Sequence, residues 1–139
     1  MNKIIAAAVV SFATLAASAH AATPTKADPV KQCFDHAQDQ EQQARCYDAA
    51  VAVQKKRLNA AYNKLIAHRN AANDSAGIAA LNQMQKDWIK SRDGMVNYLN
   101  NHVAGSASAV FVVSNDFMLD AVTKQANLLE TIRDMEGGE

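Results

Sequence analysis

The feature that most constrains this fold is an apolar spacing of three and four residues, which continues through most of the chain after Pro29. Side chains at this spacing share one face of an α-helix. Pro29 is the second of only two prolines, and the five glycines lie mainly where a helix would end. The pattern therefore predicts long, uninterrupted helices over the larger part of the chain.

Two capping signals mark where the first helices begin. Asp28 precedes Pro29, a residue that fits the first turn of a helix. Asp39 is followed three residues later by Gln42, which is the spacing of a capping box. The sequence therefore predicts a short helix first and a long helix directly after it.

Segments 70–77 and 100–108 are rich in turn-forming residues and divide the rest of the chain. Helices are therefore expected over residues 29–37, 40–69, 75–101 and 109–135. Val110 to Val113 (VFVV) is rich in β-formers, but an isolated strand would have no partner, so a helix is favoured there. The expected fold is all-α: a small antiparallel bundle of three main helices plus a short N-terminal helix.

The last long helix is expected to turn one apolar face toward the core. Val113, Phe117, Leu128 and Ile132 fit that face, with Val122 and Leu129 beside it.

The first 21 residues have the pattern of a secretory signal peptide. Lys3 gives a positive start, an apolar run follows, and Ala19-His20-Ala21 matches a cleavage site. An uncleaved membrane anchor is the alternative, but the run is short for a bilayer span. We expect a signal peptide (1–21), a flexible leader (22–28) and one helical domain (29–139) that is periplasmic or secreted, without a stable membrane anchor after cleavage.

Cys33 and Cys46 are the only cysteines in the chain. An exported protein meets an oxidising compartment, so a disulfide between them is the expected state. It would staple the short helix to the start of the long one. The alternative is a metal site formed by Cys33, His36 and Cys46, although a closed zinc site needs a fourth ligand.

The composition excludes several classes of function. Lys and Arg number 14, as do Asp and Glu, so there is no basic surplus for binding nucleic acid. The sequence has no nucleophile motif, no phosphate loop and no H-E-x-x-H. We expect neither an enzyme nor a cofactor or metal site. An envelope enzyme would need His68 or His102 in a cleft with carboxylates close by.

Two polar and aromatic stripes are expected on neighbouring helices. Their members are Leu58, Asn59, Tyr62 and Leu65 on one helix, and Trp88, Arg92 and Asp93 on the other. A Trp on an apolar stripe is most often part of the core, with contact to a partner as the alternative. We interpret the stripes as the joint between two antiparallel helices.

The second break between helices is the candidate partner-binding loop. Its polar and aromatic residues suit adaptable hydrogen bonding, and a plain solvated connection is the alternative. The candidates are Tyr98, Asn100, Asn101, His102, Ser106 and Ser108.

The order of these motifs resembles the LprI-like lysozyme-inhibitor family. The resemblance runs from Cys33 to about Thr123 and includes the capping box, L-N-x-x-Y-x-x-L and W-x-x-x-R-D. The family commonly has a second cysteine pair, whose places fall near Met95 or Val96 and near Met118. An arginine usual in the last helix is also absent, with Ala126 near its place. The chain thus resembles a divergent member, and the missing pair leaves Cys33 to bond with Cys46.

The resemblance implies a soluble periplasmic protein that binds a protein partner, with a c-type lysozyme as the candidate. Such an inhibitor would work by filling the lysozyme cleft rather than by chemistry. The alternative is a helical cell-envelope module that binds a partner other than lysozyme.

Overall fold

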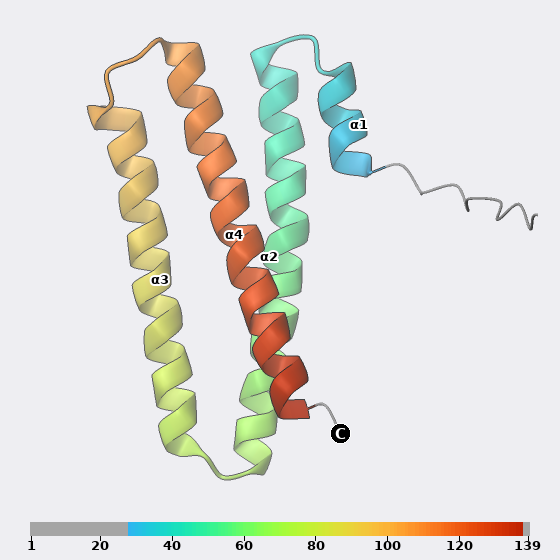
Figure 1. Cartoon of the computed structure of the whole chain (residues 1–139), viewed down its shortest axis with the longest axis vertical. Helices are drawn as coiled ribbons and strands as arrows, with labels where there is room; N and C mark the ends of the chain where they lie inside the picture. The colour runs from blue at the N-terminus through green and yellow to red at the C-terminus, as the bar shows by residue number, and fades with distance from the viewer. Residues whose placement is uncertain (1–27, 138–139) are drawn as a thin grey trace, which may run out of the picture.

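The computed structural model describes residues 28–137, and four helices account for almost all of them (Figure 1). They are α1 (Pro29–His36), α2 (Gln40–Ala71), α3 (Ser75–His102) and α4 (Ala107–Gly137). The expected all-α bundle is confirmed, and VFVV is helical. The predicted signal peptide and most of the predicted leader lie outside the described residues.

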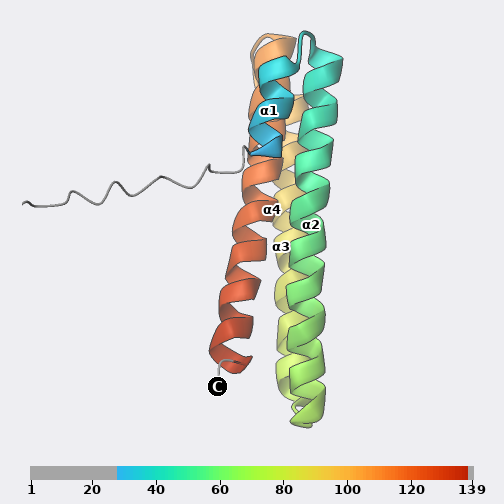
Figure 2. The same cartoon turned by 90° about the vertical axis from the view of Figure 1, so that its right-hand side faces the viewer.

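In the view of Figure 1, α2 runs down the bundle, α3 runs up and α4 runs down. Successive helices are antiparallel, so α2 and α4 point the same way, and these two have the most extensive contact (Figure 2). Sequence reasoning placed a joint between α2 and α3, where the two polar and aromatic stripes were expected to meet. In the structure α4 packs against both, and the α2–α3 contact is the smaller one.

The core lies in the part of the bundle near the α2–α3 turn. Its buried members are Leu58, Ala61, Leu65, Leu81, Val122, Ala126 and Leu129. Ala61 and Ala126 are fully buried, one on α2 and one on α4. Their small side chains let these helices approach closely, while Leu65 and Leu129 fill the space beside them.

The expected core face of α4 was wrong in part. Val113 and Leu128 are 51% and 47% exposed. The helix instead turns a neighbouring stripe inward, made of Ser114, Val122, Gln125, Ala126 and Leu129. Val122 and Leu129 of this stripe were expected beside the apolar face, whereas apolar periodicity does not mark the hydrogen-bonding Ser114 and Gln125.

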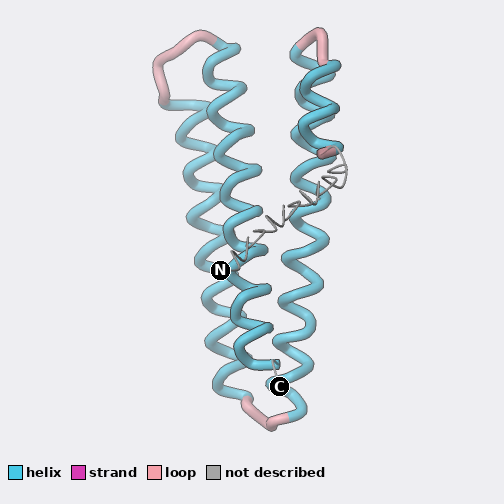
Figure 3. The backbone as a smooth tube through the Cα atoms, turned by 45° about the vertical axis from the view of Figure 1, so that its right-hand side comes forward, coloured by secondary structure: helices cyan, strands magenta, loops and turns pink. Residues whose placement is uncertain are grey.

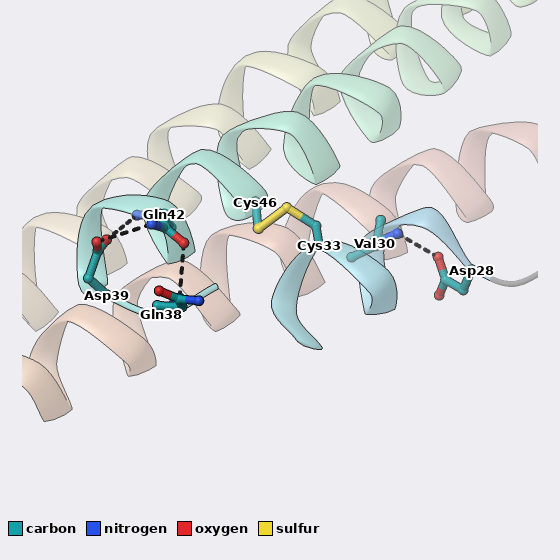
Figure 4. Close-up of a disulfide and its surroundings, with 7 residues drawn as sticks. All are labelled: Asp28, Val30, Cys33, Gln38, Asp39, Gln42 and Cys46. Carbon is teal, nitrogen blue, oxygen red and sulfur yellow. Dashed lines mark hydrogen bonds between the residues drawn. A yellow bond between two sulfur atoms is a disulfide. The ribbon is translucent and has the colours of Figure 1, made fainter. Parts of the chain in front are cut away.

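A disulfide fixes α1 to the beginning of α2, as expected (Figure 4). Cys33 and Cys46 have Cα atoms 5.6 Å apart. Beside the bond, the ring of Phe34 meets that of Tyr47 edge-on, with centroids 4.7 Å apart. Because both sulfur atoms are bonded to each other, the alternative metal site with His36 is wrong.

Aspartate caps begin both α1 and α2. Asp28 accepts from the backbone N–H of Val30 at 2.9 Å, and Asp39 accepts from that of Gln42 at 2.8 Å. The Gln42 side chain reaches back to the N–H of Gln38, one residue before the position expected for a capping box (Figure 4). The predicted cap is therefore present, in a slightly extended form.

Two connections lie together at one end of the bundle and the third lies at the other end (Figure 3). The α1–α2 and α3–α4 connections share the first end, and the α2–α3 turn forms the second. The α3–α4 connection is only residues 103–106, shorter than the expected 100–108, because α3 continues to His102 and α4 already starts at Ala107. No helix among residues 28–137 is both long enough and apolar enough to cross a bilayer.

Candidate binding surface at the α3–α4 end

The predicted partner-binding residues gather where α3 and α4 meet. Tyr98, Asn100, Asn101 and His102 occupy the last turns of α3, Ser106 lies in the connection, and Ser108 lies in the first turn of α4. All six are exposed. The structure therefore brings these residues to one end of the molecule, mostly on helix ends rather than on a loop.

Several of these polar groups already hold the hairpin together. Asn100 Oδ1 accepts a 2.6 Å hydrogen bond from Ser114 Oγ, which joins α3 to α4. Asn101 Nδ2 donates to the carbonyl and the side-chain oxygen of Asn97, one turn earlier. Ser106 Oγ accepts from the N–H of Ala109 and so begins α4. These residues therefore stabilise the hairpin. The exposed rings of Tyr98 and His102 have no part in these hydrogen bonds and remain candidates for contact with a partner.

Residues 94–115 carry no Asp, Glu, Lys or Arg, and we call this segment the uncharged tip. It includes exposed apolar side chains, namely Met95, Tyr98, Val103, Val112 and Val113. A shallow depression of about 100 Å³ also lies there, lined by Leu99, Val103, Ala104, Gly105, Ala109, Val110 and Val113. Apolar exposure without charge is typical of an interface centre. The run without charges was readable from the sequence, but its exposure was not.

A larger cleft of about 740 Å³ opens between the uncharged tip and α2, with walls from α2, α3 and α4. Its apolar lining includes Val51, Val96, Val110, Phe111 and Met118. Its polar lining includes Tyr47, Asp48, Lys55, Asn100, Ser114 and Asn115. The places expected for the second cysteine pair, near Val96 and Met118, thus fall on the walls of this cleft. Sequence reasoning missed the cleft, because its walls come from three helices that are distant in sequence.

Tyr47 forms the polar corner of that cleft. Its hydroxyl donates a 2.6 Å hydrogen bond to Asp116 on α4, and its ring also meets Phe111 edge-on at 6.1 Å. Burial, then the hydrogen bond and the negative charge of Asp116, raise the pKa of Tyr47 to about 12. The neutral phenol therefore ties α2 to α4 at this end of the bundle.

The stripes predicted as a helix joint lie further from the tip. Leu58 and Leu65 are core residues, whereas Asn59 is exposed. The Tyr62 hydroxyl donates to Asn82 on α3. Leu58, Asn59, Tyr62 and Trp88 also line a shallow groove of about 310 Å³ between α2 and α3.

Trp88 and Arg92, both members of the predicted stripe on α3, contact each other. The guanidinium carbon of Arg92 lies 4.7 Å from the ring centroid of Trp88, a cation–π geometry. Arg92 Nε also donates to Asp93 at 2.8 Å. Because the Trp88 ring packs against the core cluster, this pair covers part of the core from solvent.

The histidines of the enzyme alternative are both exposed. His68 lines a depression that also contains Asp134 and Glu136. Asp134 accepts from Arg133 at 2.6 Å, and Glu136 is paired with Arg69. His102 lies in the uncharged tip, where the sequence has no carboxylate, and its ring is tilted by 30° to that of Tyr98 with centroids 5.8 Å apart. The carboxylates near His68 are thus engaged by arginines.

The fold and this end surface describe a helical bundle with features suited to binding another macromolecule. The family model described as "Lysozyme inhibitor LprI" matches residues 33–129, so this chain belongs to the LprI lysozyme-inhibitor family. Neither the search of curated proteins nor that of solved structures gave a match.

Proposed function

We propose that this chain is an exported lysozyme inhibitor that blocks the enzyme by placing the uncharged tip in its substrate cleft. Membership of the LprI family supports a non-catalytic protein that binds lysozyme. The single observation that carries the proposed mode of binding is the segment 94–115, which is free of charge and rich in exposed apolar and amide groups. Export rests on the signal-peptide pattern of residues 1–21.

The chemistry of a lysozyme cleft explains why such a tip fits. Glycoside hydrolases of this kind use a pair of carboxylic acids flanking the scissile bond. A tip that carried carboxylates would be repelled, and a buried charge without a partner would be costly. The hydroxyl of Tyr98 and the imidazole of His102 can donate hydrogen bonds without adding a negative charge. The tip therefore offers donors and apolar contact to an acidic cleft.

The test is lysis of bacterial cell walls by a c-type lysozyme in the presence of the purified protein. We expect the protein to slow lysis in a dose-dependent manner at micromolar concentration. Val103→Glu places a carboxylate within the tip and should abolish inhibition. Val53→Glu is the matched control, because Val53 is also exposed but lies on α2 outside the tip.

Two results would contradict the proposal in different ways. Full inhibition by the Val103→Glu variant would exclude the tip as the inhibitory surface. Failure to inhibit c-, g- or i-type lysozymes at high excess would reject lysozyme as the target. A stable complex with another envelope protein would then favour the interaction-module alternative.

A further inference from the structure

The charges of this bundle are divided unevenly between its two ends. The end that holds the uncharged tip comprises residues 28–50 and 94–116 (Figure 1). It has only two basic residues, Lys31 and Arg45. Its six acidic residues, which we call the acidic flank, are Asp28, Asp35, Asp39, Glu41, Asp48 and Asp116. The formal charge of this end is therefore −4.

The opposite part of the described chain has the opposite sign. Residues 51–93 and 117–137 contain ten basic and seven acidic side chains, a formal charge of +3. The near-neutral total thus conceals a dipolar molecule. If the same charged residues were spread evenly over the surface, the two ends would carry no difference in charge.

The acidic flank faces solvent and is only partly neutralised within the protein. All six of its side chains are exposed. Lys31 pairs with Asp35 at 2.7 Å and Arg45 pairs with Glu41 at 2.7 Å, both on the surface. The remaining four acids have no basic partner within 4 Å among the described residues. A negative potential is therefore expected beside the uncharged tip.

Asp48 links this charge to the cleft between the tip and α2. It lines the 740 Å³ cleft together with Asn100 and Phe111, and Lys55, further along α2, lines the same cleft. Asp116 lies at the same end on α4, where it accepts the hydrogen bond from Tyr47. Asp48 and Asp116 therefore lie on two helices that contact each other, α2 and the α4 arm of the α3–α4 hairpin.

This arrangement has the anatomy of an interface with an uncharged centre and a charged margin. Interface centres are depleted of charge, because each buried charge has to be desolvated. Charges at the margin stay hydrated and act mainly on the association rate, which they raise for a partner of opposite sign. The tip would supply the centre, and the acidic flank would supply the margin on the side of α1 and α2.

We propose that this end of the bundle recognises a cationic protein, with the acidic flank steering the partner onto the uncharged tip. This inference rests on the proposed function for the use of the tip. It adds what surface the target presents, namely a concave site with basic residues beside it. Nucleic acids and anionic lipid surfaces carry the wrong sign for this end of the molecule. Long-range attraction of this kind falls as salt shortens the screening length.

The test measures association rates by stopped flow at several salt concentrations. The probes are a c-type lysozyme of basic isoelectric point and cytochrome c, a basic protein without a glycan cleft. Glu41→Lys/Asp48→Lys changes the charge of the acidic flank by four units on two exposed positions of α2. Asp87→Lys/Asp120→Lys is the matched control, because it changes the net charge equally on exposed positions outside this end.

We expect the flank variant to associate with lysozyme about tenfold more slowly at low salt, and the control about twofold more slowly at most. The difference should vanish at high salt. Glu41→Gln/Asp48→Asn, which removes the negative charges without adding positive ones, should associate at an intermediate rate. Wild-type helix content and an intact disulfide would show that each variant is folded.

The outcomes separate this inference from the proposed function. Equal rates for flank and control variants, or rates that ignore salt, would overturn the inference, while inhibition of lysis would still stand. Salt-sensitive, flank-dependent binding of both cationic probes without any slowing of lysis would support the inference and reject the proposed function. Head-to-tail self-association, with no binding of either probe, would overturn the inference, because the flank would then serve a second copy of this chain.

Discussion

Gln125 on α4 donates a 2.6 Å hydrogen bond from its Nε2 to Oε1 of Gln85 on α3. Both side chains are buried, at 6% and 9% exposure. The sulfur of Met84 lies 3.5 Å from the same nitrogen. A buried amide pair fixes how α3 and α4 align, because sliding either helix would leave polar groups without partners in an apolar surrounding.

Replacing one amide of this pair should destabilise the protein more than replacing both. In Gln85→Leu the Gln125 amide stays buried without its acceptor, so we expect unfolding free energy to fall by about 1–3 kcal/mol. Gln85→Leu/Gln125→Leu should recover part of that loss. Urea denaturation of the two single variants and the double variant gives the coupling free energy between the two amides. The control is Gln83→Leu on the exposed face of α3, which should change the unfolding free energy by less than about 0.5 kcal/mol. Additive losses would show that the two amides act independently.

The disulfide should stabilise α1 more than the core. Cys33 and Cys46 are 13 residues apart, a loop for which the chain-entropy model gives about 3 kcal/mol. In Cys33→Ala/Cys46→Ala we expect hydrogen exchange to speed up first in α1, because α1 contributes no buried residue. The core cluster begins only at Leu58 and should keep its relative protection. Intact mass of the exported protein should rise by two hydrogens on reduction, and two free thiols would contradict the staple.

Alkaline pH should weaken the contact between Tyr47 and Asp116. The phenol has a pKa raised to about 12 in the folded protein, against about 10 when unfolded. Its contribution to stability is therefore fully present below pH 10 and is lost as pH rises through 12, up to about 3 kcal/mol. Tyr47→Phe should be less stable than the wild type at pH 8, and the difference should shrink between pH 10 and 12. A constant difference in denaturant midpoint over this range would contradict the assignment.

Two glycines of α3 should respond in opposite ways to alanine. At Gly77 a methyl group would overlap the Asp74 carboxylate, which caps α3 by accepting from the Gly77 N–H at 2.8 Å and pairs with Arg69. Gly77→Ala should therefore destabilise by about 1 kcal/mol, the usual value of an N-cap, despite the better helix propensity of alanine. At Gly94 nothing lies within 4 Å of the added methyl.

Gly94→Ala serves as the matched control and should stabilise the protein by up to about 1 kcal/mol. Thermal melts of the two variants give the comparison. If both substitutions raised the melting temperature, the cap at Asp74 would have no part in fixing the start of α3.

The sequence alone predicted most of the local structure, because helix signals act over a few residues. Asp28 and Asp39 specify caps whatever the rest of the chain does, and the boundaries they predict agree with the structure within about a turn. The disulfide was expected from two cysteines in a chain whose first 21 residues have the pattern of an export signal. The order of short motifs also pointed to the family that the chain belongs to. Each of these motifs is short, so it can be recognised before any packing is known.

Tertiary packing decided which face of α4 is buried. Periodicity put Val113 and Leu128 inside, yet α4 turns Ser114 and Gln125 inward, because Asn100 and Gln85 on α3 satisfy their hydrogen bonds there. The 740 Å³ cleft depends on three helices meeting, and so does the separation of charge between the two ends. The sequence determined the helices, while the energy of satisfying buried polar groups decided how they face each other and what surface they present.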